Sequence, residues 1–281
     1  AFVRRVRKQG AKFQVELADG SIVEGDRLIL TPGGKAKPST GSDGNGYDLA
    51  RSFGHTITPL YPGLVQLKLA GSFFHQIQGV KLVGTVALLD GTVELSRERG
   101  DIIFGNYGLS GPPVFQLSSL VGRLLAVGKE PVLRLTIIDR MDRAALTALL
   151  NARFQQAAGK SLDFSLVGFI NKRLIPVILK VAGFQDLKRP AVTLTPEEIG
   201  RIGRILTDWR FPVRGTKSWP SAQVTVGGVA TDELNPETME SKLVPGLFLA
   251  GEIIDLAGRC GGYNLQWAWS SGYVAGENAA H

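Results

Sequence analysis

A glycine-rich stretch near the carboxyl terminus restricts the possible folds more than any other part of the sequence. Residues 246–272 place a short apolar run, 247–250, before four glycines. The run has the length of a buried strand. The glycines then allow backbone turns that a Cβ atom would forbid: Gly251, Gly258, Gly261 and Gly262. We expect Asn264 to cap a helix over 265–275. A strand that leads through glycines into a helix start presents N–H groups and a positive dipole end to an anionic ligand.

A second glycine-rich segment lies near the amino terminus. Residues 40–47 read Thr-Gly-Ser-Asp-Gly-Asn-Gly-Tyr and lead into a predicted helix over 47–53. Three glycines beside Ser42 and Asn45 can form a concave backbone nest for phosphate or ribityl oxygens. Just upstream, 31–34 read Thr-Pro-Gly-Gly after a predicted buried strand. An isolated Gly-Gly favours an ordinary loop, but its place between a strand and a second motif favours cofactor contact.

These segments resemble those of a bacterial family of FAD-dependent oxidoreductases, described as BaiN-type, aminoacetone-oxidase-like or NAD(FAD)-utilizing dehydrogenases. The resemblance rests mainly on Gly-Leu-Phe-Leu-Ala-Gly-Glu (246–252), Cys-Gly-Gly-Tyr-Asn-Leu-Gln-Trp-Ala (260–268) and the motif at 40–47. Gly-Leu-Ser-Gly-Pro (108–112) is a further family element, although Asn106 stands where many members carry His or an acidic residue. The resemblance implies an α/β fold with a glutathione-reductase-like FAD-binding domain.

The resemblance also implies which residues contact FAD. Residues 262–265, at the helix start, are expected to hold the negative charge that collects near N1 and O2 of reduced flavin. Glu252 is expected to reach a ribityl hydroxyl, although a surface carboxylate at a strand end is the alternative. The expected contacts are Thr31, Gly33, Gly34, Ser42, Gly44, Gly46, Gly251, Glu252, Gly261, Gly262, Tyr263, Asn264 and Leu265.

The expected FAD domain is incomplete and divided. Residues 1–59 and 222–281 carry its two parts, while short strands predict an inserted, barrel-like β domain over 60–139. Helical periodicity over 140–221 predicts an inserted helical subdomain that completes a cap. No Gly-x-Gly-x-x-Gly motif precedes the first strands, so we expect an amino-terminal segment of about one hundred residues to be missing.

Composition bounds the remaining possibilities. The chain has 281 residues, a single cysteine (Cys260), and 32 Lys and Arg against 25 Asp and Glu. One cysteine excludes an internal disulfide and fits a cytoplasmic protein. The basic residues look scattered, so we expect a small-molecule substrate rather than nucleic acid, and no run is long enough for a membrane span. No metal-ligand cluster is visible.

The catalytic residues are not identified. His55 is expected to be structural and His75 to lie on the surface, while Cys260, with no Cys-x-x-Cys motif, is expected to pack the loop. Trp267 and Trp269 are expected to pack the last helix. The sequence therefore predicts an FAD-dependent dehydrogenase or oxidase that moves a hydride between a small organic substrate and flavin, with NAD(P) or oxygen as second partner. The competing interpretation is a truncated, non-catalytic fragment that binds no FAD.

Overall fold

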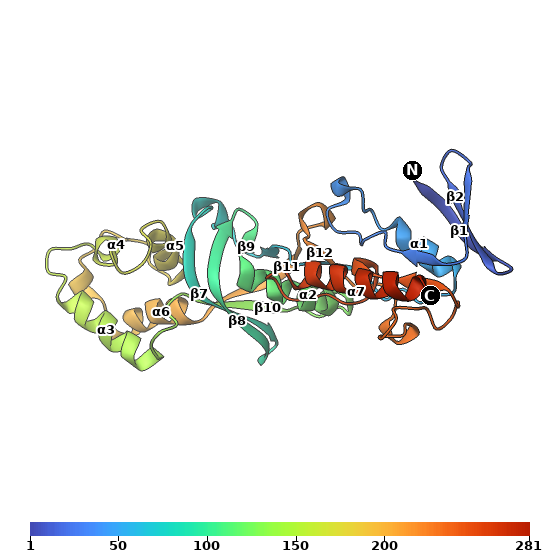
Figure 1. The fold of residues 1–281 in the computed structure, drawn as a ribbon. Helices are drawn as coiled ribbons and strands as arrows, with labels where there is room; N and C mark the ends of the chain where they lie inside the picture. Colours follow the sequence, from blue (N-terminus) through green and yellow to red (C-terminus); the bar gives the residue numbers. More distant parts are fainter. The chain divides into compact units, whose positions relative to one another are not determined.

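Two compact units make up the computed structural model, which describes residues 1–281 (Figure 1). Unit 1 joins Ala1–Val65 to Lys217–His281, and unit 2 is the continuous segment Gln66–Thr216. Residues 60–65 and 217–221, which the sequence analysis placed in the inserted segments, therefore lie in unit 1. Each unit has its own hydrophobic core.

Unit 1 begins with a three-stranded antiparallel sheet, β1 (Val3–Gln9), β2 (Lys12–Leu17) and β3 (Ile22–Gly25). The apolar side chains of Val6 and Phe13 alternate with polar neighbours and are buried, as the sequence pattern predicts. The remaining strands form two short sheets, in which β12 (Val224–Val226) pairs with β5 (Tyr61–Gly63) and β13 (Leu247–Leu249) pairs in parallel with β4 (Leu28–Leu30).

The pairing of β13 with β4 brings together the two glycine-rich segments of the sequence. The chain leaves β4 toward Gly33 and α1 (Asn45–Ser52), and it leaves β13 toward Gly251 and α7 (Tyr263–Ala279). Because the strands are parallel, both segments emerge from the same edge of the sheet. The other side of β4 pairs with no strand.

Unit 2 is built on a closed barrel in which six strands follow the order β10-β11-β6-β9-β8-β7. The strands are β6 (Leu67–Leu69), β7 (Lys81–Asp90), β8 (Val93–Gly105), β9 (Gly108–Ser110), β10 (Val132–Thr136) and β11 (Trp209–Thr216). Strand β11 shows how the strands divide between the inside and the outside of the barrel. Trp209, Phe211 and Val213 alternate with exposed neighbours and are buried in the core, and closure leaves no open sheet edge.

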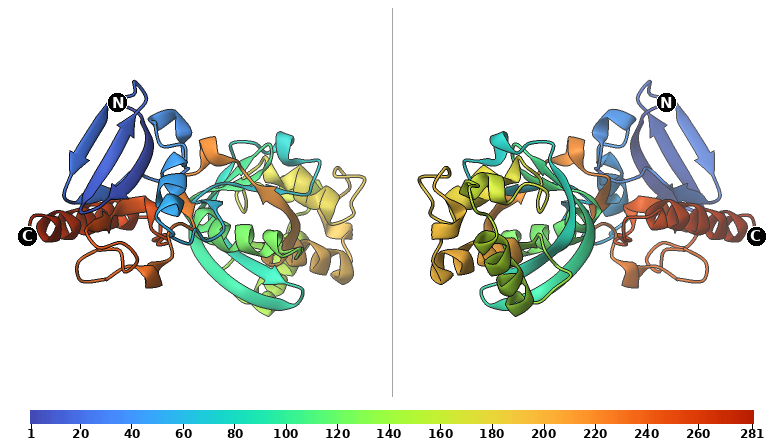
Figure 2. Two further views of the ribbon diagram at one scale, coloured as in Figure 1. Left: turned by 90° about the vertical axis from the view of Figure 1, so that its right-hand side faces the viewer. Right: turned by 90° about the vertical axis from the view of Figure 1, so that its left-hand side faces the viewer.

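Helix α2 (Pro112–Ala126) corrects the expectation that residues 64–139 contain strands only. A proline suits the first turn of a helix because its missing N–H needs no partner there. Val114, Leu117 and Val121 then recur on one face and are buried against the barrel (Figure 2). Strand β8 is also longer than the short strand expected at 92–95, because it continues through a stretch at 97–101 that is rich in charged residues.

Four more helices share the core of the barrel and lie to one side of it within unit 2 (Figure 1). They are α3 (Arg143–Gln155), α4 (Leu162–Ser165), α5 (Leu174–Val181) and α6 (Pro196–Thr207). The start of α6 is a capping box, as the sequence Thr-Pro-Glu-Glu at 195–198 predicts. The Thr195 hydroxyl accepts from the Glu198 N–H, and the Glu198 carboxylate accepts from the Thr195 N–H. Residues 164–172, where the helical periodicity favours a further helix, do not form one, because Gly168 has a φ of 80° and interrupts it.

No helix of the protein is both long and apolar enough to span a membrane.

Candidate active site

The start of α7 is the centre of the candidate site. Gly262 precedes the helix with a φ of 92°, and no side chain caps this end. The Gln266 N–H donates to the Gly262 carbonyl at 3.0 Å, so the preceding N–H groups have no acceptor within the helix. The positive end of the helix dipole therefore borders a cavity of about 310 Å³ in unit 1.

The cavity combines an apolar wall with polar groups. Leu64, Val224 and Ala268 supply apolar surface, and Gln223 and Arg259 supply polar surface. This mixture suits a flat ring system with polar edges. Of the predicted cofactor contacts, the following line the cavity: Glu252, Gly261, Gly262, Asn264 and Leu265.

Asn264 does not cap α7 as predicted. Helix α7 begins at Tyr263, the residue before Asn264, so Asn264 lies inside the first turn of the helix. Its Oδ1 accepts from the Gly258 N–H at 2.7 Å, and its Nδ2 donates to the Gly258 carbonyl at 3.0 Å. Asn264 thus fixes the loop that leads into the helix, instead of satisfying the helix end.

Glu252 joins the two glycine-rich segments through Thr225, a residue that sequence reasoning missed. The Glu252 Oε1 accepts from the Thr225 N–H at 2.9 Å, and the Thr225 hydroxyl accepts from the N–H groups of Lys35 and Ala36 at 2.7 and 3.0 Å. The sequence Val-Thr-Val at 224–226 could have indicated this role, because a threonine buried in a short apolar strand needs hydrogen-bond partners. Glu252 Oε2 has no hydrogen-bond partner in the protein and remains available to a ligand hydroxyl.

The predicted glycines fall into two physical classes. A Cβ on Gly34 would lie 2.2 Å from Glu252 Oε1, and one on Gly46 would lie 2.0 Å from Pro32 Cγ. Gly33 is likewise crowded, by Ser42 at 2.6 Å. These glycines are explained by protein packing. By contrast, Gly262 has a positive φ and open space around it, which is the arrangement that lets a ligand approach the backbone.

Thr31, Ser42 and Gly44 have different surroundings from those at α7. Thr31 is exposed just beyond β4, and the Ser42 hydroxyl donates to the Gly34 carbonyl at 2.5 Å, which stabilises the loop. Gly44 lines a second cavity, of about 390 Å³, together with Lys35 and Tyr47. This second cavity lies in unit 1 as well.

Tyr47 provides a test of whether this region fits a polar cofactor. Its side chain is buried, and its hydroxyl has no hydrogen-bond partner in the protein. Burial raises the pKa of the Tyr47 phenol most, the charges of Glu252 and Asp255 raise this pKa further, and the neighbouring Thr225 hydroxyl lowers it only in part. The hydroxyl therefore stays protonated as a buried donor without an acceptor, which fits a ligand oxygen.

Other conspicuous side chains have structural roles. His55 is buried between Glu233, at 2.7 Å from Nδ1, and Ser241, at 2.9 Å from Nε2, so the structural interpretation is confirmed. The indole N–H of Trp267 donates to the Gly251 carbonyl at 3.1 Å and anchors α7. Trp269, expected to pack the helix, is instead 68% exposed.

The comparison with protein families decides the identity of the fold. The model described as "HI0933-like protein Rossmann domain" matches residues 2–278. The chain belongs to the HI0933-like family. The predicted resemblance to BaiN-type proteins is confirmed, and so is the Rossmann-like α/β class.

Three curated relatives of this HI0933-like chain carry two different names. The "3-dehydro-bile acid delta(4,6)-reductase" of Clostridium scindens is 40% identical over 97% of the chain and 66% of the relative. The "Ribosomal RNA dihydrouridine synthase" of Escherichia coli is 31% identical over 98% of the chain and 66% of its own length. A protein of the same name from Haemophilus influenzae is 29% identical over 88% of the chain and 58% of its own length.

Two facts follow from these names and lengths. The chain spans about two thirds of the relatives from Clostridium scindens and Escherichia coli. The expectation that nucleic acid is not a partner has no support, because two relatives are named as ribosomal RNA enzymes.

Proposed function

We propose that this HI0933-like chain holds the flavin ring of an FAD-dependent reductase that adds hydrogen to a carbon–carbon double bond conjugated with a carbonyl group. Both relative names describe such chemistry: one reduces a dehydro-bile acid, and dihydrouridine is uridine with its ring double bond saturated. The observation that carries the proposal is the uncapped, glycine-led start of α7 beside a cavity that also holds Glu252.

The residues of unit 1 have distinct roles in this proposal. Bound FAD would supply the hydride in its reduced form, NAD(P)H would supply the two electrons that reduce it, and a proton from water would complete the saturated bond. Residues 262–265 stabilise negative charge on the ring through the helix dipole and backbone N–H groups. Glu252 Oε2 accepts a ribityl hydroxyl, and the buried Tyr47 hydroxyl donates to a cofactor oxygen. Asn264 holds the 258–262 loop in the shape that leaves the helix start open.

The decisive measurement is FAD binding by wild type and by two matched asparagine variants. Asn264→Leu removes both bonds to Gly258, so we expect about tenfold weaker FAD binding. Asn278→Leu is the control, because Asn278 lies on the same helix and donates only to the Val274 carbonyl, at 2.9 Å. Equal FAD affinity and equal flavin potential in Asn264→Leu and wild type contradict the assigned site.

The fragment interpretation makes the opposite prediction. If the chain binds no FAD under any condition, it is a non-catalytic part of a larger flavoprotein. If FAD binds, anaerobic mixing of the reduced protein with a conjugated ketone tests the reaction through the return of the oxidised flavin spectrum. A steroid dienone and a uridine-containing RNA represent the two relative names and identify the substrate class.

An open strand edge predicts that flavin binding improves when further chain is supplied. The β4 edge has no partner, and Leu265, Trp269 and Tyr273 of α7 are each more than 60% exposed. Apolar surface of this kind normally has a partner. Adding the part of the Clostridium scindens relative that this chain does not match is expected to raise FAD occupancy per chain. If this chain alone binds one FAD per chain, further chain is not needed for flavin binding, and this prediction is wrong.

A further inference from the structure

The net positive charge of the protein lies entirely in unit 2. Residues 66–216 hold 20 Lys and Arg against 12 Asp and Glu, a net charge of +8. Unit 1 holds 12 against 13, a net charge of −1. The excess of basic residues therefore coincides with one folded unit. A charge asymmetry of this kind indicates a polyanionic partner for one unit.

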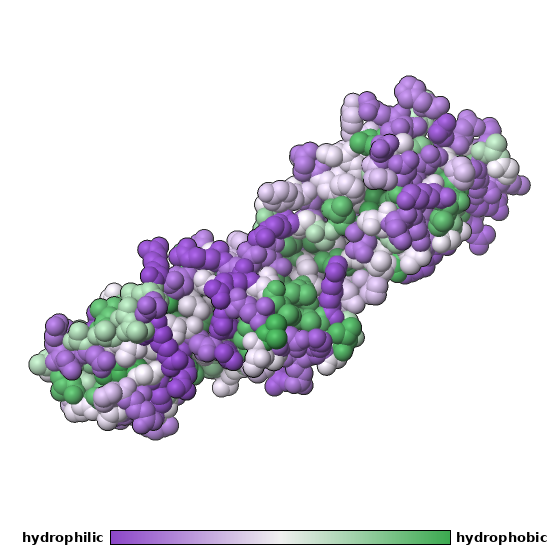
Figure 3. Space-filling model, turned by 90° about the horizontal axis from the view of Figure 1, so that it is seen from below, coloured by the Kyte–Doolittle hydropathy of each residue, from purple (hydrophilic) through white to green (hydrophobic).

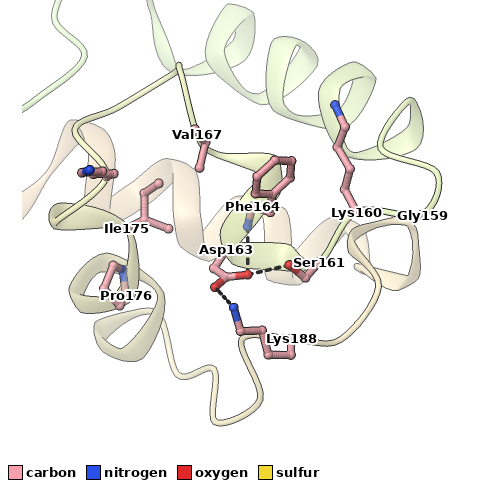
Figure 4. A pocket seen from close by; sticks show the side chains of 10 residues that line it. Gly159, Lys160, Ser161, Asp163, Phe164, Val167, Ile175, Pro176 and Lys188 are labelled. Carbon is pink, nitrogen blue, oxygen red and sulfur yellow. Dashed lines mark hydrogen bonds and ion pairs between the residues drawn. The ribbon is translucent and has the colours of Figure 1, made fainter.

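A cavity at the helical end of unit 2 combines this charge with exposed apolar surface. The cavity has a volume of about 440 Å³ and is lined by α4, the start of α5 and the loops beside them (Figure 4). Phe164, at its wall, is 59% exposed, and Val167 is 46% exposed. In Figure 3, the left-hand end, which holds α3 to α6, shows hydrophobic surface directly beside strongly hydrophilic side chains.

The charged groups of the cavity leave it positive. Asp163 is the acidic residue among those that line it, and its carboxylate accepts from Lys188 Nζ at 2.6 Å and from the Ser161 hydroxyl at 2.6 Å (Figure 4). Lys188 therefore offsets this carboxylate. Lys160 and Lys172, both exposed, have no acidic partner, so two cations remain for an anionic ligand.

The aromatic wall is held in place by hydrogen bonds to buried structure. Arg153 of α3 donates to the Ser165 carbonyl at 2.6 Å and to the Val167 carbonyl at 2.8 Å. The backbone N–H groups of Leu162 and Asp163 donate to the segment at 187–189. Phe164 is thus exposed on a fixed backbone, and a ligand that stacks on it pays little entropy for ordering the loop.

We propose that this cavity binds single-stranded nucleic acid, with one base stacked on Phe164 and neighbouring phosphates at Lys160 and Lys172. An exposed ring and unpaired lysines in the wall of one cavity are the combination that single-strand binding uses, because every base has a π-face and every linkage has a charge. An acidic peptide matches the lysines but supplies no regular series of flat rings. The proposal does not depend on flavin, because unit 1 contributes no residue to it.

The test is anisotropy of a labelled single-stranded RNA of about twelve nucleotides, within the usual footprint of one small binding module. Phe164→Leu keeps the apolar volume but removes the ring, so we expect about tenfold weaker binding. Phe164→Tyr keeps the ring and should bind like wild type. These side chains are exposed, and circular dichroism checks that each variant is folded.

The lysines are tested by salt dependence. Lys160→Gln and Lys172→Gln should each lower the slope of log affinity against log salt by about 0.7, the value for one phosphate contact on a single strand. Lys180→Gln makes the same charge change on α5 outside the cavity and should leave the slope unchanged. A DNA strand of the same sequence shows whether the 2′-hydroxyl contributes.

Two results overturn the proposal. One is RNA affinity that is the same in wild type, Phe164→Leu and Lys160→Gln, because binding is then a property of overall charge. The other is competition by poly-glutamate that equals competition by unlabelled RNA, because the cavity then recognises acidic groups without bases.

Discussion

Unit 1 and unit 2 differ in how completely each buries its own backbone and apolar side chains. Unit 2 closes its sheet into a barrel and covers it with helices around one large core. Unit 1 has sheets of two or three strands, an unpaired edge on β4 and an exposed aromatic face on α7. Short sheets of this kind are marginal without further packing. The unit that contains the two glycine-rich segments is therefore the one whose stability should depend most on a ligand or other partner.

The largest expected effect tests whether the two cores are independent. Trp209 is buried among Phe73, Phe104 and Phe211, with ring centroids 4.9 to 6.2 Å away. Trp209→Ala leaves a large cavity and should lower the free energy of unfolding of unit 2 by about 3–5 kcal/mol. Because the core of unit 1 contains none of these residues, hydrogen exchange should accelerate in 66–216 only. Equal acceleration of hydrogen exchange in both units would show that the two cores do not unfold independently.

FAD should stabilise unit 1 and leave unit 2 unchanged. Ligand at one hundred times its dissociation constant stabilises the state that binds it by about 2.7 kcal/mol. We expect this gain as slower hydrogen exchange in 1–65 and 217–281, with no change in 66–216. Riboflavin at the same concentration separates ring binding from contacts to the rest of the cofactor. Protection that appears only in unit 2 contradicts the assigned site.

The next effect concerns Glu233, whose hydrogen bonds to His55 and Thr56 connect the two sequence segments of unit 1. Burial alone raises the pKa of Glu233, but hydrogen bonds from Thr56 and His55 outweigh it and hold this pKa below its usual 4.5. A lowered carboxyl pKa gives stability that is present above pH 4.5 and is lost as pH falls through the folded pKa. Glu233→Ala should cost unit 1 about 2 kcal/mol at neutral pH.

The acid sensitivity of unit 1 distinguishes this pair from an ordinary surface contact. Wild-type unit 1 should lose stability as the pH falls below 4.5, and Glu233→Ala should lose less over the same range, because its carboxylate is already absent. Glu237→Ala, on the same connection but without a side-chain hydrogen bond, is the control. Identical pH profiles for wild type and Glu233→Ala contradict the role of the pair.

The smallest effect is a helix cap in unit 2. Thr195→Ala removes the hydroxyl that accepts from the Glu198 N–H at 3.2 Å and should cost about 1 kcal/mol. Thr195→Ser keeps the hydroxyl and should restore most of the loss. The change should appear in thermal unfolding of unit 2 and leave FAD binding unaltered. Weaker FAD binding in Thr195→Ala shows that the two units are coupled.

Local rules predicted those elements whose signals are local. The capping box of α6 requires only neighbouring residues and is confirmed. In β2, Phe13 is buried, but Val15 and Leu17 are no more buried than Gln14 and Glu16. Helix α2 was missed, because its burial depends on a barrel formed by strands from distant parts of the sequence. The extent of β8 was missed for the same reason. Its charged stretch at 97–101 is held in the sheet by pairing with 83–87 of β7.

The candidate site shows the same division between local and distant information. Positive φ at Gly262 and the helix after it follow from the glycine pattern. The bonds from Asn264 to Gly258 and the bridge through Thr225 depend on how the loops meet in space. Sequence reasoning also assigned one role to all the glycines, whereas Gly34 and Gly46 are crowded by protein atoms. The assignment of the thirteen contacts to FAD stays a prediction.

The divided unit 1 has a consequence for the newly made protein on the ribosome. Strand β4 cannot pair until β13 has been synthesised, because Leu28 lies opposite Leu247. That distance of about 220 residues takes roughly ten to forty seconds at ~5–20 residues per second. Unit 2 is continuous and can fold within this interval, while the apolar side of the first sheet waits in solution. The nascent chain is therefore most exposed to misassociation, and most dependent on chaperones, before residues 217–281 emerge.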